Sequence, residues 1–180
     1  MDIEQIIGRI QKGDTYLYGT VIQQFEQKIY ITVYRLVKNR TVAEDLVQEI
    51  FIKAFYSLSK YKQTGTFQAW LYRLVMNYCF DYLRKTKQSF VLDESESVDH
   101  QYPEKVLLLY ERNRELEQLL KQLEETEYMV LLLRYVNELS YDEISEVLQI
   151  SGTDVRNKLH RSKQKLRKLT NQQGGRFYEM

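Results

Sequence analysis

The sequence is poor in the residues that interrupt helices. Only one of its 180 residues is a proline, Pro103, and only seven are glycines. No glycine lies between Gly19 and Gly65, or between Gly65 and Gly152. Long spans without these helix breakers are typical of helical chains. The scarcity therefore predicts an all-α protein.

Long apolar runs are missing as well. The longest, such as residues 129–133, hold about five residues, whereas a membrane-spanning helix needs about 20. The N-terminal Met-Asp-Ile-Glu is acidic and has no signal-peptide pattern, so we expect a cytoplasmic protein. The single cysteine, Cys79, cannot form an internal disulfide and stands in an apolar pattern, which indicates a small buried side chain.

The sequence also lacks the common signatures of enzymes. It has no glycine-rich phosphate loop, no clustered metal carboxylates and no paired nucleophile and base. His160 has no Cys/His cluster around it, which argues against a metal ligand. We therefore expect no catalytic residue, no cofactor, no metal and no small-molecule substrate, and an enzyme such as a nuclease is disfavoured.

The net charge of +1 hides an uneven distribution. Residues 1–90 carry 13 Lys/Arg and 8 Asp/Glu, and residues 127–180 carry 9 and 7. Between them, residues 91–126 carry only 4 basic residues against 10 acidic ones. Basic ends around an acidic middle suggest two modules that bind polyanions, joined by a segment with another role.

Apolar residues recur at helical spacing through most of the chain. They predict helices over residues 2–12, 14–39, 41–58, 67–85, 104–122 and 124–137, followed by two more. Asp14 is expected to cap the second helix, and Thr41 to Glu44 forms a capping box for the third. A polar loop lies at residues 59–66, and residues 86–103 have no period, which indicates a linker.

The last two helices have the rhythm of a helix-turn-helix. Ser140 to Glu143 is a capping box that opens a short helix ending at Leu148. After a turn, Ser151 can cap the next helix, near whose positive end Asp154 is favourable. Two caps around one short helix therefore predict a DNA-binding unit from about Tyr141 to Lys168.

The second of these helices has one apolar side and one basic side. Residues 153–168 hold seven Lys/Arg and one acid. Arginine and amide side chains can read base edges in the major groove, while flanking cations neutralise phosphates. The predicted DNA contacts are Arg156, Asn157, Lys158, His160, Arg161 and Gln164.

Three segments in order resemble the sigma-70 family of bacterial RNA polymerase factors. Residues 43–55, Ala-Glu-Asp-Leu-Val-Gln-Glu-Ile-Phe-Ile-Lys-Ala-Phe, resemble the helix that grips core polymerase. Residues 67–84 look like the promoter-melting helix, and residues 141–166 look like the domain that reads the upstream (−35) element. Their order and spacing are similar to those of the extracytoplasmic-function (ECF) group.

The resemblance implies two small helical domains joined by a flexible linker. It assigns residues 1–88 to sigma region 2, residues 89–112 to an acidic linker and residues 113–172 to sigma region 4, with a tail at 173–180. In the family the linker threads positively charged channels of the polymerase, although a plain tether fits the composition equally well.

The resemblance also assigns roles to residues of the first domain. Asp45, Gln48 and Glu49 would face the clamp helices of the polymerase. Melted DNA of the downstream (−10) element needs aromatic, basic and amide groups to hold unstacked bases. The residues implied for that task are Lys53, Tyr61, Asn77 and Arg84. Asn77 matches a residue that lines the pocket for a flipped base, and Tyr61 with its loop would close that pocket.

The implied partners are core RNA polymerase, through its β′ clamp helices and β flap, promoter DNA and an anti-sigma factor that could hold the protein at the membrane. One departure from the family lies at Asp154, where a Thr is common; the carboxylate would either repel phosphates or accept from a cytosine. The alternative function is an autonomous helix-turn-helix regulator whose N-terminal domain senses a ligand or dimerises. The pattern of residues 43–85 favours the sigma factor.

Overall fold

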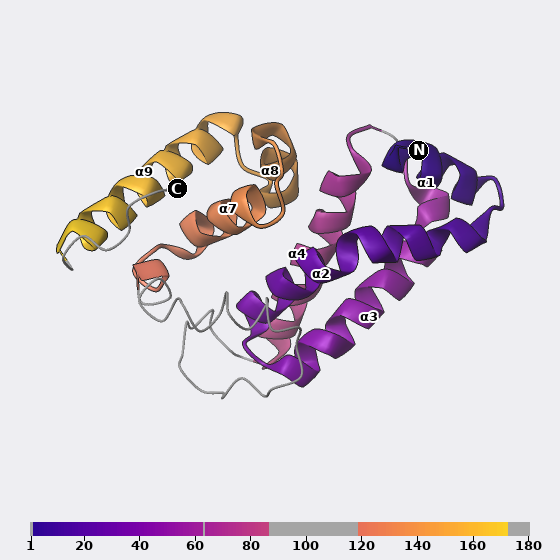
Figure 1. The fold of residues 1–180 in the computed structure, drawn as a ribbon, viewed down its shortest axis with the longest axis horizontal. Helices are drawn as coiled ribbons and strands as arrows, with labels where there is room; N and C mark the ends of the chain where they lie inside the picture. The colour runs from indigo at the N-terminus through magenta and orange to yellow at the C-terminus, as the bar shows by residue number, and fades with distance from the viewer. Residues whose placement is uncertain (1, 63, 87–118, 173–180) are drawn as a thin grey trace.

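The computed structural model describes residues 2–62, 64–86 and 119–172, and within them every regular element is a helix (Figure 1). The predicted linker at 89–112 and tail at 173–180, and nearly all of the helix predicted over 104–122, lie outside the described residues. In the part described, no helix is both long and apolar enough to cross a bilayer.

The N-terminal domain, residues 2–86, contains four α-helices and two short 3₁₀ turns. Its elements are α1 (Ile3–Gln11), η1 (Thr15–Leu17), α2 (Tyr18–Val37), α3 (Arg40–Ser57), η2 (Leu58–Lys60) and α4 (Phe67–Thr86). The apolar stripe of α2, with Val21, Ile29 and Val33 fully buried, packs between α3 and α4. Phe25 of α2 meets Phe67 of α4 edge to face, with ring centroids 5.9 Å apart.

Two helix starts differ from the sequence prediction. The Asp14 carboxylate accepts from Arg9 Nε at 2.7 Å and makes no cap, so a 3₁₀ turn precedes α2. Helix α3 begins at Arg40 and is capped by Asn39, whose Oδ1 accepts from Val42 N at 3.0 Å. The Thr41 capping box was therefore wrong, because Lys38 in the left-handed conformation (φ 55°) reverses the chain two residues earlier.

The C-terminal domain, residues 119–172, contains α7 (Glu125–Tyr135), α8 (Tyr141–Leu148) and α9 (Gly152–Gln172). Four apolar residues of the helix-turn-helix form its buried side: Ile144, Val147, Val155 and Leu159 expose at most 5% of their surface. They pack against the apolar side of α7. The helical fold class and the helix-turn-helix are thus confirmed.

The two domains lie side by side, with α8 packed against α4 (Figure 1). At the centre of this contact Asn137, just after α7, donates from Nδ2 to Thr32 Oγ1 of α2 at 2.9 Å. Lys28 of α2 forms an ion pair with Glu138 at 2.6 Å. The domain contact therefore has a polar centre, which could not be predicted from the sequence because its partners are about 100 residues apart.

Candidate nucleic-acid interface

The helix-turn-helix is fixed by side-chain caps at both helix starts. Ser140 Oγ accepts from Glu143 N at 3.2 Å while Glu143 Oε2 accepts from Ser140 N at 2.7 Å, the reciprocal pair of a capping box. Helix α8 ends at Gln149 in the left-handed conformation (φ 55°). Ser151 Oγ then accepts from Asp154 N at 3.0 Å and starts α9. These caps set the angle at which α9 is presented.

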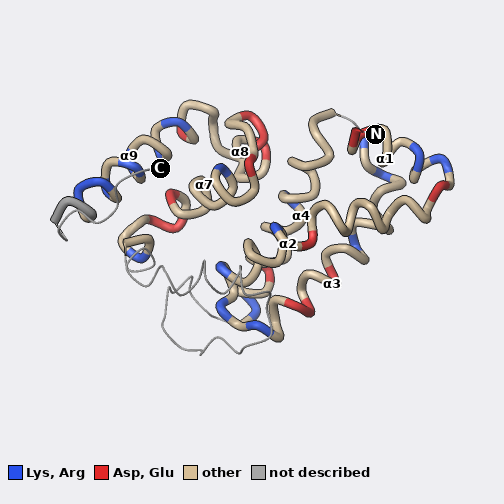
Figure 2. The backbone as a smooth tube through the Cα atoms, in the orientation of Figure 1, with Lys and Arg blue, Asp and Glu red and all other residues tan. Residues whose placement is uncertain are grey.

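Five of the six residues predicted to contact DNA on α9 are exposed. They form one continuous outward arc, opposite the buried Val155, Leu159 and Ser162. Basic residues recur along the length of α9 (Figure 2). The exposed residues of the arc are Arg156, Asn157, His160, Arg161 and Gln164. The geometry is that of a helix able to enter a major groove.

Lys158 is placed differently from the other five. It is half-buried, and its Nζ donates to Thr126 Oγ1 of α7 at 2.7 Å. About two helical turns further on, Lys165 pairs with the buried carboxylate of Glu127 at 2.7 Å. Burial acts to raise the pKa of Glu127, but the hydrogen bonds from Lys165 and the Glu124 backbone, together with the charges of Lys165 and Lys158, outweigh burial and hold the pKa below its ordinary value. Both lysines therefore hold α9 to α7.

Asp154 is occupied by its own helix start. Its Oδ2 accepts from Ser151 Oγ at 2.6 Å while its backbone N–H donates to the same hydroxyl. A carboxylate in the first turn of a helix is also favoured by the helix dipole. Asp154, which stands where a Thr is common in the family that the sequence resembles, thus has a local structural role.

Helix α4 has an exposed face that carries two of the predicted melting residues. Asn77 and Arg84 lie two turns apart on this face, and Arg84 pairs with Asp81 there. The opposite face is core, with Tyr72 and Cys79 fully buried. Burial raises the pKa of the Cys79 thiol to about 12, as expected of an inert apolar side chain.

Tyr61 lies in the core rather than on the surface. It exposes 8% of its area, and its hydroxyl donates to Glu4 Oε2 and Gly65 O, both at 3.3 Å. Its ring centroid is 5.3 Å from that of Trp70, which is itself half-buried. Burial, followed by the nearby Glu4 carboxylate, raises the pKa of Tyr61. Tyr61 thus supports the loop before α4 from beneath.

Helix α3 presents a second exposed stripe. Asp45, Gln48 and Glu49 all face solvent, while Leu46, Val47 and Ile50 on the other side are buried. Ile52 continues the exposed stripe and shows 58% of its surface. Sequence reasoning missed Ile52, although its position three residues beyond Glu49 places it on the same face. Lys53 is exposed beside it.

These features define a two-domain helical protein. The C-terminal domain carries a basic recognition helix, α9, and the exposed face of α4 in the N-terminal domain is a second candidate for binding nucleic acid. The model of Sigma-70 region 2 matches residues 21–89, and that of Sigma-70 region 4 matches residues 113–166. The ECF RNA polymerase sigma factor SigW of Bacillus subtilis is 31% identical over 93% of this chain and 96% of its own length.

Two solved structures have a similar fold. One is CnrH in complex with the cytosolic domain of CnrY, with a TM-score of 0.70 and 20% identity over 92% of this chain and 95% of that one. The other is the sigma factor RpoE in complex with the anti-sigma factor NepR from Bartonella quintana, with a TM-score of 0.66 and 18% identity over 86% and 96% of the two chains.

The chain belongs to the sigma-70 family, in its extracytoplasmic-function group. It is a transcription initiation factor that binds core RNA polymerase and directs promoter recognition and DNA melting. The reading as an autonomous regulator finds no support among these relatives.

Proposed function

We propose that the two exposed faces of this sigma factor grip the promoter at two points, with α9 on the −35 element and α4 on the −10 element. The observation that carries this proposal is the exposure of Asn77 and Arg161 on separate domains of one chain. The division is into residues 1–88, a linker at 89–112, residues 113–172 and a tail at 173–180. The family matches at 21–89 and 113–166 support these bounds.

At the −35 element, the exposed arc of α9 reads duplex DNA. Arg156, Asn157 and Arg161 in its first half supply bidentate donors and an amide for base edges, and Gln164 and His160 extend the contact. Lys158 acts indirectly, because its ammonium is spent on Thr126 and fixes the angle of α9. Asp154 stabilises the helix start through its two hydrogen bonds with Ser151, and its negative charge repels a phosphate placed beside it.

At the −10 element, α4 holds bases that have left the stack. Flipping a base out of a duplex costs a few kcal/mol, so a protein group must replace the lost pairing. The exposed Asn77 amide offers both a donor and an acceptor for a base edge, while Arg84 and Lys53 attract the phosphates of the strand. Tyr61 contributes by holding the loop in place rather than by stacking on the base.

Core polymerase is bound by the exposed stripe of α3. Asp45, Gln48 and Glu49 provide polar and charged contacts to the clamp helices, and Ile52 adds an apolar contact at the same face. The C-terminal domain would bind the β flap.

The test is the affinity of Glu49→Lys for core polymerase, with Glu26→Lys, an exposed residue of α2, as the charge-matched control. We expect a loss of about tenfold or more for Glu49→Lys alone; equal affinity of both would refute the assignment.

We further propose that an anti-sigma factor holds this protein inactive. The solved structures of similar fold are described in complex with CnrY and with the anti-sigma factor NepR. Because its partners are RNA polymerase and promoter DNA, the protein works in the cytoplasm. It acts by binding these partners and catalyses no reaction of its own. A membrane-anchored inhibitor would place it at the membrane when inactive.

A further inference from the structure

An apolar groove lies between η1, α2 and α3, where it encloses about 580 Å³. Helix α3 is on the side of the N-terminal domain that is remote from α7, α8 and α9 (Figure 1). At the rim of the groove stand Tyr16, Ile52 and Tyr56, which expose 72%, 58% and 74% of their surface. They are three of the five large hydrophobic side chains that the described residues expose. Such a gathering is typical of a surface that binds a partner.

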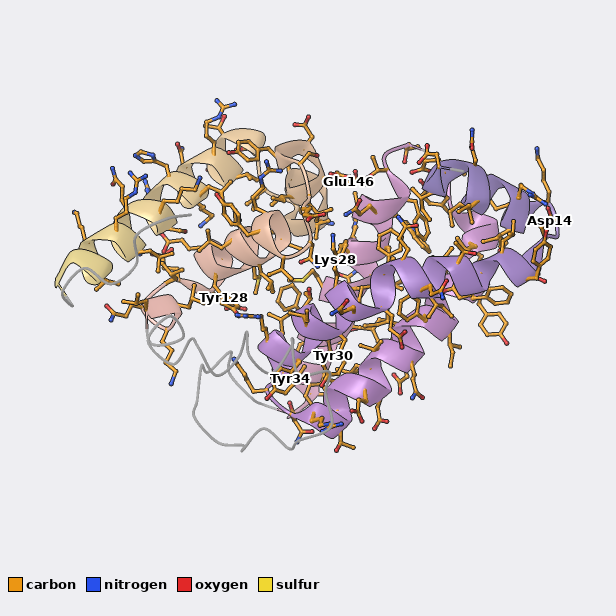
Figure 3. The ribbon with its side chains drawn as sticks, in the orientation of Figure 1. Asp14, Lys28, Tyr30, Tyr34, Tyr128 and Glu146 are labelled. Carbon is orange, nitrogen blue, oxygen red and sulfur yellow. The ribbon has the colours of Figure 1, made fainter. Side chains whose placement is uncertain are left out.

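Hydrogen bonds hold the side chains of this groove in place. Below the rim, the Tyr18 hydroxyl donates to Phe51 O at 2.6 Å, which ties α2 to α3. At the rim, Arg9 Nη2 donates to the Tyr16 hydroxyl at 3.1 Å, and Arg9 Nε pairs with Asp14 at 2.7 Å. Figure 3 shows Asp14 at the end of the N-terminal domain that is remote from the C-terminal domain. A partner therefore meets aromatic side chains that are already ordered, which lowers the entropy cost of binding.

The charges at the two ends of the groove have opposite signs. The exposed side of α3 carries, at helical spacing, Asp45, Glu49, Ile52 and Tyr56. The two acidic residues come before the apolar ones, and the exposed Lys60 of η2 comes after them. Nucleic acid is a poor partner for this face, because its phosphates would lie against Asp45 and Glu49. The groove instead fits a protein surface whose charges are divided in the reverse order.

A second copy of this chain has such a surface. In a two-fold dimer with the α3 helices antiparallel, each contact is made twice. The midpoint between positions 45 and 60 falls between residues 52 and 53, and so does the midpoint between positions 49 and 56. One axis therefore sets Asp45 opposite the second copy's Lys60. The same axis sets Glu49 opposite the second copy's Tyr56, whose hydroxyl can donate to a carboxylate. The Ile52 side chains of the two copies meet beside this axis.

We propose that the free protein forms a two-fold dimer through this groove, and that core polymerase and the second copy compete for α3. The dimer rests on the groove and its charges alone, whereas the competition rests on the proposed core-binding stripe of Asp45, Gln48 and Glu49. An interface built on one groove is small, so we expect a dissociation constant in the micromolar range. Free protein that accumulates thereby masks the face with which it binds polymerase.

The first test is sedimentation velocity of the full-length protein without polymerase, at concentrations across the micromolar range. Asp45→Lys and Lys60→Glu each place like charges opposite one another, and the two-fold axis repeats the change. We expect each to weaken dimerisation about tenfold, with helical content unchanged by circular dichroism. Lys168→Glu, at an exposed lysine of α9, is the charge-matched control for Lys60→Glu and should change the dissociation constant less than about twofold.

Combining the two changes in one chain tests the antiparallel pairing itself. Asp45→Lys with Lys60→Glu restores opposite charges across the axis, so the double variant should dimerise about as strongly as wild type. Wild type that stays monomeric at every concentration would overturn the proposal, and so would a dimer that neither single change weakens. A double variant that dimerises no better than the single variants would also overturn it, because residues 45 and 60 would then not face each other.

Competition is tested by energy transfer between copies that carry a donor or an acceptor dye at the N-terminus. We expect transfer between wild-type copies, and its loss when core polymerase is added in excess. Transfer that persists while core binds the protein would overturn the competition for α3. Failure of Glu49→Lys to weaken core binding, with the dimer and its charge reversal intact, would instead refute the proposed core-binding stripe and leave the dimer standing.

Discussion

The Asn137 side-chain amide donates to Thr32 Oγ1 at 2.9 Å, and neither residue exposes any surface. The bond joins residues 105 positions apart, on the two separate domains of the chain. Thr32 Oγ1 also donates to Lys28 O at 2.8 Å within α2, so it keeps a partner whether the domains are together or apart. Asn137 is the partner that loses its bond when they separate.

Asn137→Ala should therefore weaken the contact between the two domains without unfolding either one. The loss of one buried hydrogen bond corresponds to about 1 kcal/mol. Small-angle scattering should show a larger radius of gyration than for wild type, with helical content unchanged by circular dichroism. Asn157→Ala, which removes an exposed amide of the same domain, is the control. An unchanged radius of gyration for Asn137→Ala would show that this bond does not hold the domains together.

The variants Arg161→Ala and Lys158→Ala should distinguish residues of α9 that contact DNA from residues that hold α9 to α7. Arg161 is exposed, so its loss should weaken promoter binding by the polymerase holoenzyme by about 1–3 kcal/mol and leave core binding intact. Lys158 donates a hydrogen bond to Thr126 of α7. Lys158→Ala should therefore lower the midpoint of thermal unfolding more than Arg161→Ala does, and should weaken DNA binding less than Arg161→Ala does. The opposite order in the DNA-binding assay would place Lys158, and not Arg161, at the DNA.

Asn77→Ala should impair strand opening. The exposed amide can hold a base edge only after the base has left the stack, so its loss penalises duplex promoters, which must be melted. Permanganate footprinting of holoenzyme should show fewer open complexes on a duplex promoter, and a smaller defect on a template with a pre-melted −10 element. Defects of equal size on both templates would remove the support for a role in melting.

Glu127→Gln should destabilise the C-terminal domain in a pH-dependent way. The pKa of Glu127 is lowered in the folded protein, so its ion pair with Lys165 stabilises the fold above the ordinary value of 4.5 and less as pH falls through the lower folded value. At about pH 7 the variant should be about 2 kcal/mol less stable than wild type in urea, and at about pH 3 the difference should shrink. A difference that does not change with pH would show that the carboxylate is not the group responsible; Glu125→Gln is the control.

The sequence predicted most of the helices and the helix-turn-helix because these depend on local patterns. The periodic burial of Val155 and Leu159 and the caps at Ser140 and Ser151 are visible in a few consecutive residues. The prediction was wrong at Thr41, since the capping pattern there competes with Asn39, and only the reversal of the chain at Lys38 decides between them.

The features that sequence missed depend on partners far away in the chain. Lys158 carries the same charge as its basic neighbours on α9. Only its hydrogen bond to Thr126 on α7 distinguishes it from the residues of the exposed arc. The resemblance implied that Tyr61 and its loop close a base pocket, but Glu4 and Trp70 enclose the Tyr61 side chain in the core. The contacts of Glu143 with Thr66 and of Glu146 with Gly65 likewise need both domains in place.

The most direct test of a two-point promoter grip is run-off transcription from genomic DNA with core polymerase, with the transcripts sequenced. We predict defined start sites only when core and this protein are both present, preceded by two shared elements near −10 and −35. Arg161→Ala should lower transcript output to an extent that depends on the sequence of the upstream (−35) element. The effect of Asn77→Ala should depend on the sequence of the downstream (−10) element. Tight binding of the protein to DNA alone, with no binding to core and no defined transcripts, would contradict the account.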